Sequence, residues 1–200
     1  MPNKTIIIGD SHVGIGYNID QYIGIYIGAL TAYNVANHDD KVQEQLVKHP
    51  DLPLVFCVGS VDVIYHVYPN AVAKNVTTEV TTREIVNRYV PYLCKLQKTR
   101  TSKVYAMCLE PAGDMEDPVF KSMPYSWDKL NEMTLYYNKF LGDTCRENNI
   151  GFIDIYDQMI DPTGHRRSDW VYQYPNGVRD GFHMDNHVGL AVWEKYFKNP

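Results

Sequence analysis

Four short apolar runs, each continuous rather than alternating, constrain the fold of this chain more than any other feature. They occupy residues 5–8, 54–58, 104–109 and 152–156, and only Asp154 interrupts the last run. Continuous apolarity is typical of strands that are covered on both faces, as in parallel sheets. We therefore expect these runs to be buried strands of one parallel sheet.

Helical patterns lie between and after these runs. Thr81 and Glu84 fit a capping box that opens one helix, which Pro91 can kink, and a second helix is predicted to start near Ser126. Apolar residues recur at three- and four-residue steps in both. They are Ile85, Tyr89, Leu93 and Leu96 in the first helix, and Leu130, Met133, Tyr137, Leu141 and Cys145 in the second.

The sequence near the carboxyl terminus predicts one kind of element, whereas the sequence near the amino terminus fits two. A final helix is predicted to begin near Asp185 or Asn186, whereas residues 14–36 fit either a short strand near Tyr26 or a helix. Strands and helices thus alternate along the chain. This alternation predicts an α/β fold with helices on both faces of a parallel sheet.

Composition and charge indicate the kind of domain and the kinds of partner that can be expected. The 200 residues are 44% hydrophobic and 22% charged, as expected for one folded domain spanning residues 1–200. A net charge of −5 argues against a nucleic-acid partner or an anionic membrane surface. The one basic cluster, residues 165–167, is short and reads as a solvated loop.

The cysteines and the apolar runs bear on the cellular setting. The four cysteines, at positions 57, 94, 108 and 145, form no Cys-x-x-Cys motif and are expected to be buried thiols. No signal-peptide core and no apolar run of membrane-spanning length is seen. We expect a cytoplasmic protein, although a virion-associated or exported protein would have the same features.

Ser11 is the first candidate for chemistry. Gly9-Asp10-Ser11 follows the first predicted strand, so Ser11 is expected on a tight, exposed turn at the carboxyl end of that strand. The amide of Ser11 could face a developing oxyanion. Gly-Asp-Ser alone is weak evidence, because most such tripeptides are ordinary turns.

Asp180 and His183 supply the partners that a catalytic serine needs. They lie in Asp180-Gly181-Phe182-His183, which is expected to be a loop just before the last helix. An aspartate can accept the Nδ1 proton of a histidine and orient its Nε2 toward a serine. The alternative is that Asp180 caps a turn and His183 is half-buried under Phe182.

These two blocks, at opposite ends of the chain, resemble those of the SGNH or GDSL hydrolases. In that family a Gly-Asp-Ser block follows the first strand, and an Asp-x-x-His block precedes the last helix. The resemblance covers nearly the whole chain and implies a three-layer α/β/α sandwich with a flavodoxin-like parallel sheet of about five strands. It also implies ester hydrolysis by Ser11, His183 and Asp180.

The family's two middle blocks, which supply oxyanion donors, match less well. By position, Gly28 resembles the glycine block, and the segment from Gly59 to Asp62 resembles the Gly-x-Asn-Asp block. Val61 stands where the asparagine belongs, and valine cannot donate a hydrogen bond. The predicted oxyanion and substrate-binding residues are Gly28, Gly59, Asp62 and Asp10.

The missing oxyanion donor and the role of Asp62 each leave alternatives open. Ser60 and His66 are candidates to replace the missing donor. Asp62 is either a loop anchor at the strand end or a residue that shapes the site.

Two alternatives to a serine esterase remain open on the sequence. One is an SGNH-fold binding or structural module with weak or lost catalysis, consistent with Val61. The other is a metal site at His183 and His187 with Asp180 and Asp185, although the motif of the usual zinc proteases is absent. We expect no metal or cofactor, and a small-molecule ester or an acylated glycan as substrate.

Overall fold

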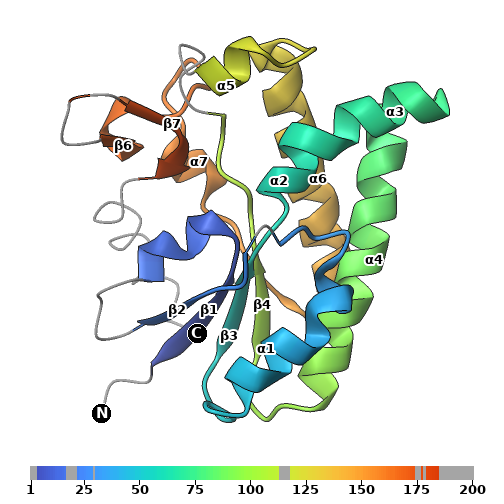
Figure 1. The fold of residues 1–200 in the computed structure, drawn as a ribbon, viewed down its shortest axis with the longest axis vertical. Helices are drawn as coiled ribbons and strands as arrows, with labels where there is room; N and C mark the ends of the chain where they lie inside the picture. Colours follow the sequence, from blue (N-terminus) through green and yellow to red (C-terminus); the bar gives the residue numbers. More distant parts are fainter. Residues whose placement is uncertain are drawn as a thin grey trace.

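A parallel sheet of five strands forms the centre of the molecule in the computed structural model, which describes residues 4–16, 22–28, 30–112, 118–173, 177 and 179–184. The strand order is β2-β1-β3-β4-β5 (Figure 1). This order is that of flavodoxin-like sheets, so the predicted fold class is confirmed. The strands are β1 (Thr5–Gly9), β2 (Tyr22–Tyr26), β3 (Leu54–Cys57), β4 (Val104–Met107) and β5 (Gly151–Ile153).

All four predicted strand runs are found, and the open segment contributes a strand, β2, that ends at Tyr26. Side chains of successive residues point to opposite faces of the sheet. In β1, Ile6 and Ile8 belong to one apolar core and Ile7 to the other. Burial on both faces is the reason that these runs are continuously apolar.

Helices cover both faces. One face packs against α1 (Asp39–Leu46), α4 (Thr78–Lys98) and α6 (Trp127–Glu147). The other packs against η1 (Ser11–Gly16), α7 (Tyr156–Met159) and η4 (Ser168–Trp170). Shorter helical segments follow β2, β3 and β4: η2 (Val35–His38), α2 (Ser60–Asp62), η3 (Val63–Val67), α3 (Tyr68–Lys74) and α5 (Pro118–Lys121).

One predicted helix start is confirmed and one is wrong. Ser126 caps α6, because its hydroxyl accepts a hydrogen bond from the Lys129 amide at 3.2 Å. Helix α4 starts earlier than predicted, with Thr77 as its cap, so Thr81 and Glu84 lie inside the helix. Pro91 also lies inside α4, which continues unbroken to Lys98.

Part of the carboxyl-terminal region forms a hairpin. Strands β6 (Val171–Gln173) and β7 (Arg179–Met184) pair antiparallel, and β7 includes residues 180–183, which were expected to form a loop. The helix predicted from residue 185 lies outside the described residues.

The cysteines are free thiols, with Cys57, Cys108 and Cys145 buried and Cys94 half-buried. No helix within the described ranges is long and apolar enough to cross a membrane.

Candidate active site

Ser11 lies where the sequence predicts it. Strand β1 ends at Gly9, Asp10 forms a bend, and Ser11 is the exposed first residue of η1. A Cβ atom on Gly9 would lie 2.0 Å from the carbonyl oxygen of Cys57, so only glycine allows β1 to approach β3 this closely. The turn therefore presents Ser11 at the carboxyl edge of the sheet, where α/β folds place their ligands.

Asp180 and His183 lie in strand β7, not in the predicted loop. The loop prediction failed because β6 offers β7 a pairing partner, with Gln173 opposite Arg179 and Val171 opposite Met184. Strand β7 contacts η1, the helical turn that begins with Ser11. The two halves of the predicted triad are thus on adjacent elements, while the side chains of Asp180 and His183 lie outside the described part of the structure.

Gly28 follows β2, the strand next to β1 in the sheet. The Ile27 amide donates to the carbonyl of Gly9 at 3.1 Å, which holds the end of β2 beside the serine turn. Gly28 has a φ of +95°, and a Cβ there would meet open space, so backbone conformation rather than packing favours glycine. Its role as an oxyanion donor stays a prediction.

Gly59 and Asp62 shape the corresponding turn after β3. Gly59 has a φ of +124°, and a Cβ there would lie 2.4 Å from the hydroxyl of Tyr137. The fully buried Asp62 carboxylate accepts hydrogen bonds from the amides of Ala32, at 2.6 Å, and Tyr33, at 3.3 Å. Asp62 is therefore an anchor for the loop that follows β2, and its role in shaping the site stays a prediction.

The Asp62 carboxyl is unusual in its protonation. Burial raises its pKa to about 7, against the two amide donors, which lower it. The nearby Asp10 adds to the increase. At neutral pH this anchor is thus close to the midpoint of its titration.

His12 is a site residue that the sequence reading missed. Its Nδ1 lies 2.6 Å from Oδ1 of Asp10, which also accepts from the His12 amide at 3.0 Å. Burial lowers the pKa of His12, but the hydrogen bond and charge of Asp10, aided by Glu110, outweigh burial and raise it to about 9. His12 is therefore a buried cation beside the serine turn. The available signal was its spacing, because a histidine two residues after an aspartate can close an Asx-type turn.

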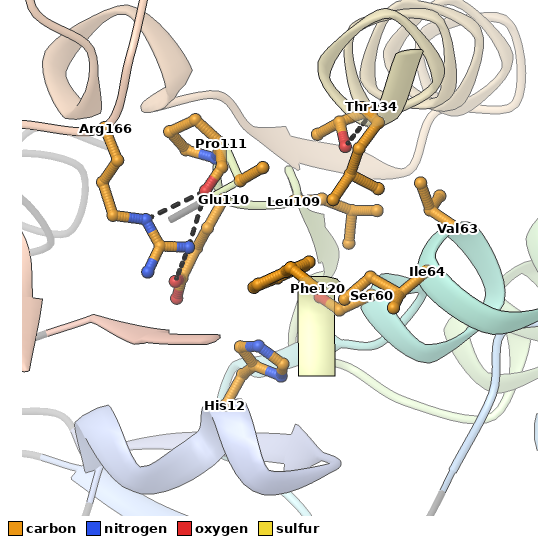
Figure 2. A pocket seen from close by; sticks show the side chains of 12 residues that line it. His12, Ser60, Val63, Ile64, Leu109, Glu110, Pro111, Phe120, Thr134 and Arg166 are labelled. Carbon is orange, nitrogen blue, oxygen red and sulfur yellow. Dashed lines mark hydrogen bonds and ion pairs between the residues drawn. The ribbon is translucent and has the colours of Figure 1, made fainter. Parts of the chain in front are cut away.

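A second buried charge pair lies beside the first. Glu110, just after β4, forms an ion pair with Arg166 at 3.2 Å, and both side chains are buried (Figure 2). Arg166 also donates two hydrogen bonds, from Nε at 2.9 Å and Nη2 at 2.6 Å, to the carbonyl of Pro111. The reading of residues 165–167 as a solvated loop is therefore wrong for Arg166, because a partner 56 residues earlier in the chain neutralises its charge.

Three members of these pairs, His12, Glu110 and Arg166, line a small cavity, which we call the His12 cavity. It is lined by His12, Ser60, Glu110, Phe120 and Arg166 among others, and its volume is about 20 Å3 (Figure 2). That volume holds one water molecule and is too small for an acyl chain. Of the two candidates to replace the missing asparagine, Ser60 lines this cavity, and His66 lies in a different one.

The described residues contain no group of three histidine, cysteine, aspartate or glutamate side chains that could hold a metal ion. The metal alternative involved His183 and His187 with Asp180 and Asp185. His187 and Asp185, and the side chains of the other two, lie outside the described part.

Comparison with known proteins supports the fold. No protein-family model and no curated protein sequence matches this chain. A phospholipase A1 from Streptomyces albidoflavus is similar in structure, with a TM-score of 0.61, 12% identity, and coverage of 98% of this chain and 99% of that one. A carbohydrate acetylesterase from Sinorhizobium meliloti has a TM-score of 0.61, 14% identity, and coverage of 98% and 97%.

A variant of an acetyl-xylooligosaccharide esterase from Geobacillus is also similar, with a TM-score of 0.58, 12% identity, and coverage of 100% and 98%. Likeness at such low identity concerns the fold, and it extends over the full length of the chain and of these three proteins. Together with the Gly9-Asp10-Ser11 and Asp180-Gly181-Phe182-His183 blocks, it identifies the fold of this chain as that of the SGNH/GDSL hydrolases.

Proposed function

We propose that this protein is a serine hydrolase that cleaves carboxylic esters. Ser11 is the nucleophile, His183 the general base, and Asp180 the residue that orients His183. The observation that carries the proposal is the exposed Ser11 at the carboxyl edge of the sheet, on a helical turn that contacts β7. The esterases and the phospholipase among the structural neighbours support the reaction class, and their different substrates leave the ester itself open.

The proposed reaction has two steps. His183 takes the proton of the Ser11 hydroxyl as Ser11 Oγ attacks the ester carbonyl, and the amides of Ser11 and Gly28 donate to the oxyanion. Collapse of this intermediate breaks the bond to the alcohol, which leaves with the proton from His183. Water, deprotonated by His183, then attacks the acyl-enzyme and releases the acid and Ser11.

Val61 sets the expected rate. Loss of one oxyanion donor costs roughly a hundred- to a thousandfold in turnover. We therefore expect a slow esterase compared with enzymes that have asparagine at this position. A binding module that has kept the fold is the second candidate, and the same valine favours it.

The test is hydrolysis of p-nitrophenyl acetate and butyrate from pH 5 to 9, together with labelling by a fluorophosphonate probe. The wild type should turn over both esters, with a rate that rises through the histidine range, about pH 6 to 7. Ser11→Ala and His183→Ala should abolish turnover, and Ser11→Ala should abolish labelling. Ser168→Ala, which changes an exposed serine outside the proposed machinery, is the matched control.

Two outcomes would contradict the proposal. If the wild type is as inactive as both variants and resists the probe, the binding module is the better reading. If activity survives Ser11→Ala and disappears with a chelator, a metal-dependent hydrolase replaces the serine mechanism.

A further inference from the structure

A second cavity opens at the same edge of the sheet, on the side of Asp62 where α3 and α4 meet. Residues after β2 and β3 and the second turn of α4 line it, including Thr31, Asn34, Asp62, His66, Asn70 and Thr81. Its volume is about 340 Å3, within the range of small-molecule sites, whereas the His12 cavity has about 20 Å3. We call it the Asp62 cavity.

Its buried wall contains a hydroxyl that needs a partner. Thr81 is 2% exposed, and its Oγ1 has no hydrogen-bond partner among the described residues. The next residue behaves differently, because the Thr82 hydroxyl donates to the carbonyl of Thr78 at 2.9 Å. A buried hydroxyl without a partner is costly, so a group inside the cavity is expected to bond to Thr81.

Polar side chains form part of the rim. Asn70 and His66 are exposed, and Asn34 is half-buried. Tyr33 is 45% exposed, and the guanidinium of Arg88 lies 3.9 Å from the centroid of its ring. These groups offer donors, acceptors and one fixed aromatic ring, a combination that suits a ligand with many hydroxyls.

The charged residues of the Asp62 cavity argue against an anionic ligand. Lys74 and Glu84 form an ion pair at the rim and neutralise each other. The remaining acid, Asp62, disfavours an anion, and the hydroxyl, amide and carboxyl groups of the lining favour a ligand that forms hydrogen bonds. A neutral, hydroxyl-rich molecule fits this lining best.

We propose that the Asp62 cavity binds a neutral saccharide, the sugar portion of an acylated glycan whose ester reaches Ser11. The role of the sugar as part of a substrate rests on the proposed esterase function, whereas its binding does not. Position favours the link, because β2, β1 and β3 are neighbours in the sheet, and the serine turn leaves the strand between the two that lead into this cavity. Asp62 also holds Ala32 and Tyr33, in the loop that follows Gly28, so an occupant would touch the loop that carries the predicted oxyanion glycine.

The test is direct binding to the full chain, measured by calorimetry and by saturation-transfer NMR. The neutral probes are xylotetraose, cellotetraose and chitotetraose, and the anionic probe is 3′-sialyllactose. At least one neutral probe should bind saturably, and Thr81→Val and Asn70→Ala should each weaken it about three- to tenfold, the effect of one lost hydrogen bond. Thr82→Val is the matched control and should leave the affinity unchanged, because its hydroxyl bonds within the helix.

The outcomes separate this inference from the esterase proposal. Failure of every neutral probe to bind, preference for the anionic probe, or equal affinity in Thr81→Val, Asn70→Ala and wild type would overturn the inference and leave a water-filled cavity. Turnover of p-nitrophenyl acetate, which has no sugar, reports on Ser11 alone. Saccharide binding without such turnover would support the cavity and contradict the esterase.

Discussion

Two buried aspartates at one edge of the sheet have opposite surroundings. Asp10, at the end of β1, pairs with the cationic His12, and the adjoining cavity has room for one water molecule. Asp62, after β3, accepts hydrogen bonds from the backbone amides of Ala32 and Tyr33, and it borders a cavity of about 340 Å3. The region with an internal counter-charge is closed, whereas the region without one is open to a ligand.

The largest expected effect comes from breaking the charged pair. His12→Leu leaves the buried Asp10 without its partner, so we expect the free energy of unfolding to fall by about 3–5 kcal/mol. Denaturant unfolding at pH 7 measures it. Adding Asp10→Asn to His12→Leu should recover part of the loss, because the orphaned charge is then removed. A cost below about 1 kcal/mol for His12→Leu would mean that the pair contributes little to closing this region.

A smaller effect is the dependence of the free energy of unfolding on pH, which differs between His12 and Asp62. The pKa of His12 is raised to about 9 from 6.5, so its contribution to stability is complete below pH 6.5 and is lost as pH rises through 9. The pKa of Asp62 is raised to about 7 from 3.8, so its contribution is complete below about pH 4 and is lost as pH rises through 7. At 1.36 kcal/mol per pKa unit, the loss should approach about 3 kcal/mol for His12 and about 4 kcal/mol for Asp62.

Unfolding curves collected from pH 4 to 10 separate these contributions. His12→Gln should flatten the stability profile only above pH 6.5, and Asp62→Asn only below about pH 7. If either variant flattened the other window instead, the assignment of the two windows would be wrong.

The central sheet could be predicted from the sequence because a strand that is buried on both faces is a continuous apolar run, which is a local pattern. The run at residues 54–58 predicts β3 to within one residue, and Ser126 predicts the start of α6. The start of α4 could not be fixed, since Thr77 and Thr81 are both suitable caps and the structure uses the first. The hairpin of β6 and β7 was missed because its strands are short and owe their form to pairing with each other.

The candidate site likewise contains residues that a local sequence pattern predicts and residues that it does not. The turn at Ser11 follows from a strand that ends in Gly9-Asp10-Ser11, a local pattern. The burial of His12 and Arg166 depends on partners that pack beside them, and Glu110 and Pro111 lie more than 50 residues before Arg166. A charged residue normally indicates exposure, so no local pattern predicts its burial. For His12 the spacing to Asp10 indicates the pairing but not the burial. For Arg166 the partner is distant in the sequence, so spacing indicates neither.

The smallest effect tests the open region itself. Thr81→Val and Thr82→Val make the same change at adjacent buried positions of α4, and only Thr82 has a partner for its hydroxyl among the described residues. Thr82→Val should lower the free energy of unfolding by about 1 kcal/mol, the usual net value of one hydrogen bond. Thr81→Val should be neutral or stabilising, because it replaces a buried hydroxyl without a protein partner by a methyl group. Thermal unfolding without ligand measures both, and an equal loss in the two variants would show that Thr81 is already satisfied and that the Asp62 cavity lacks the unmet hydrogen bond on which its ligand would depend.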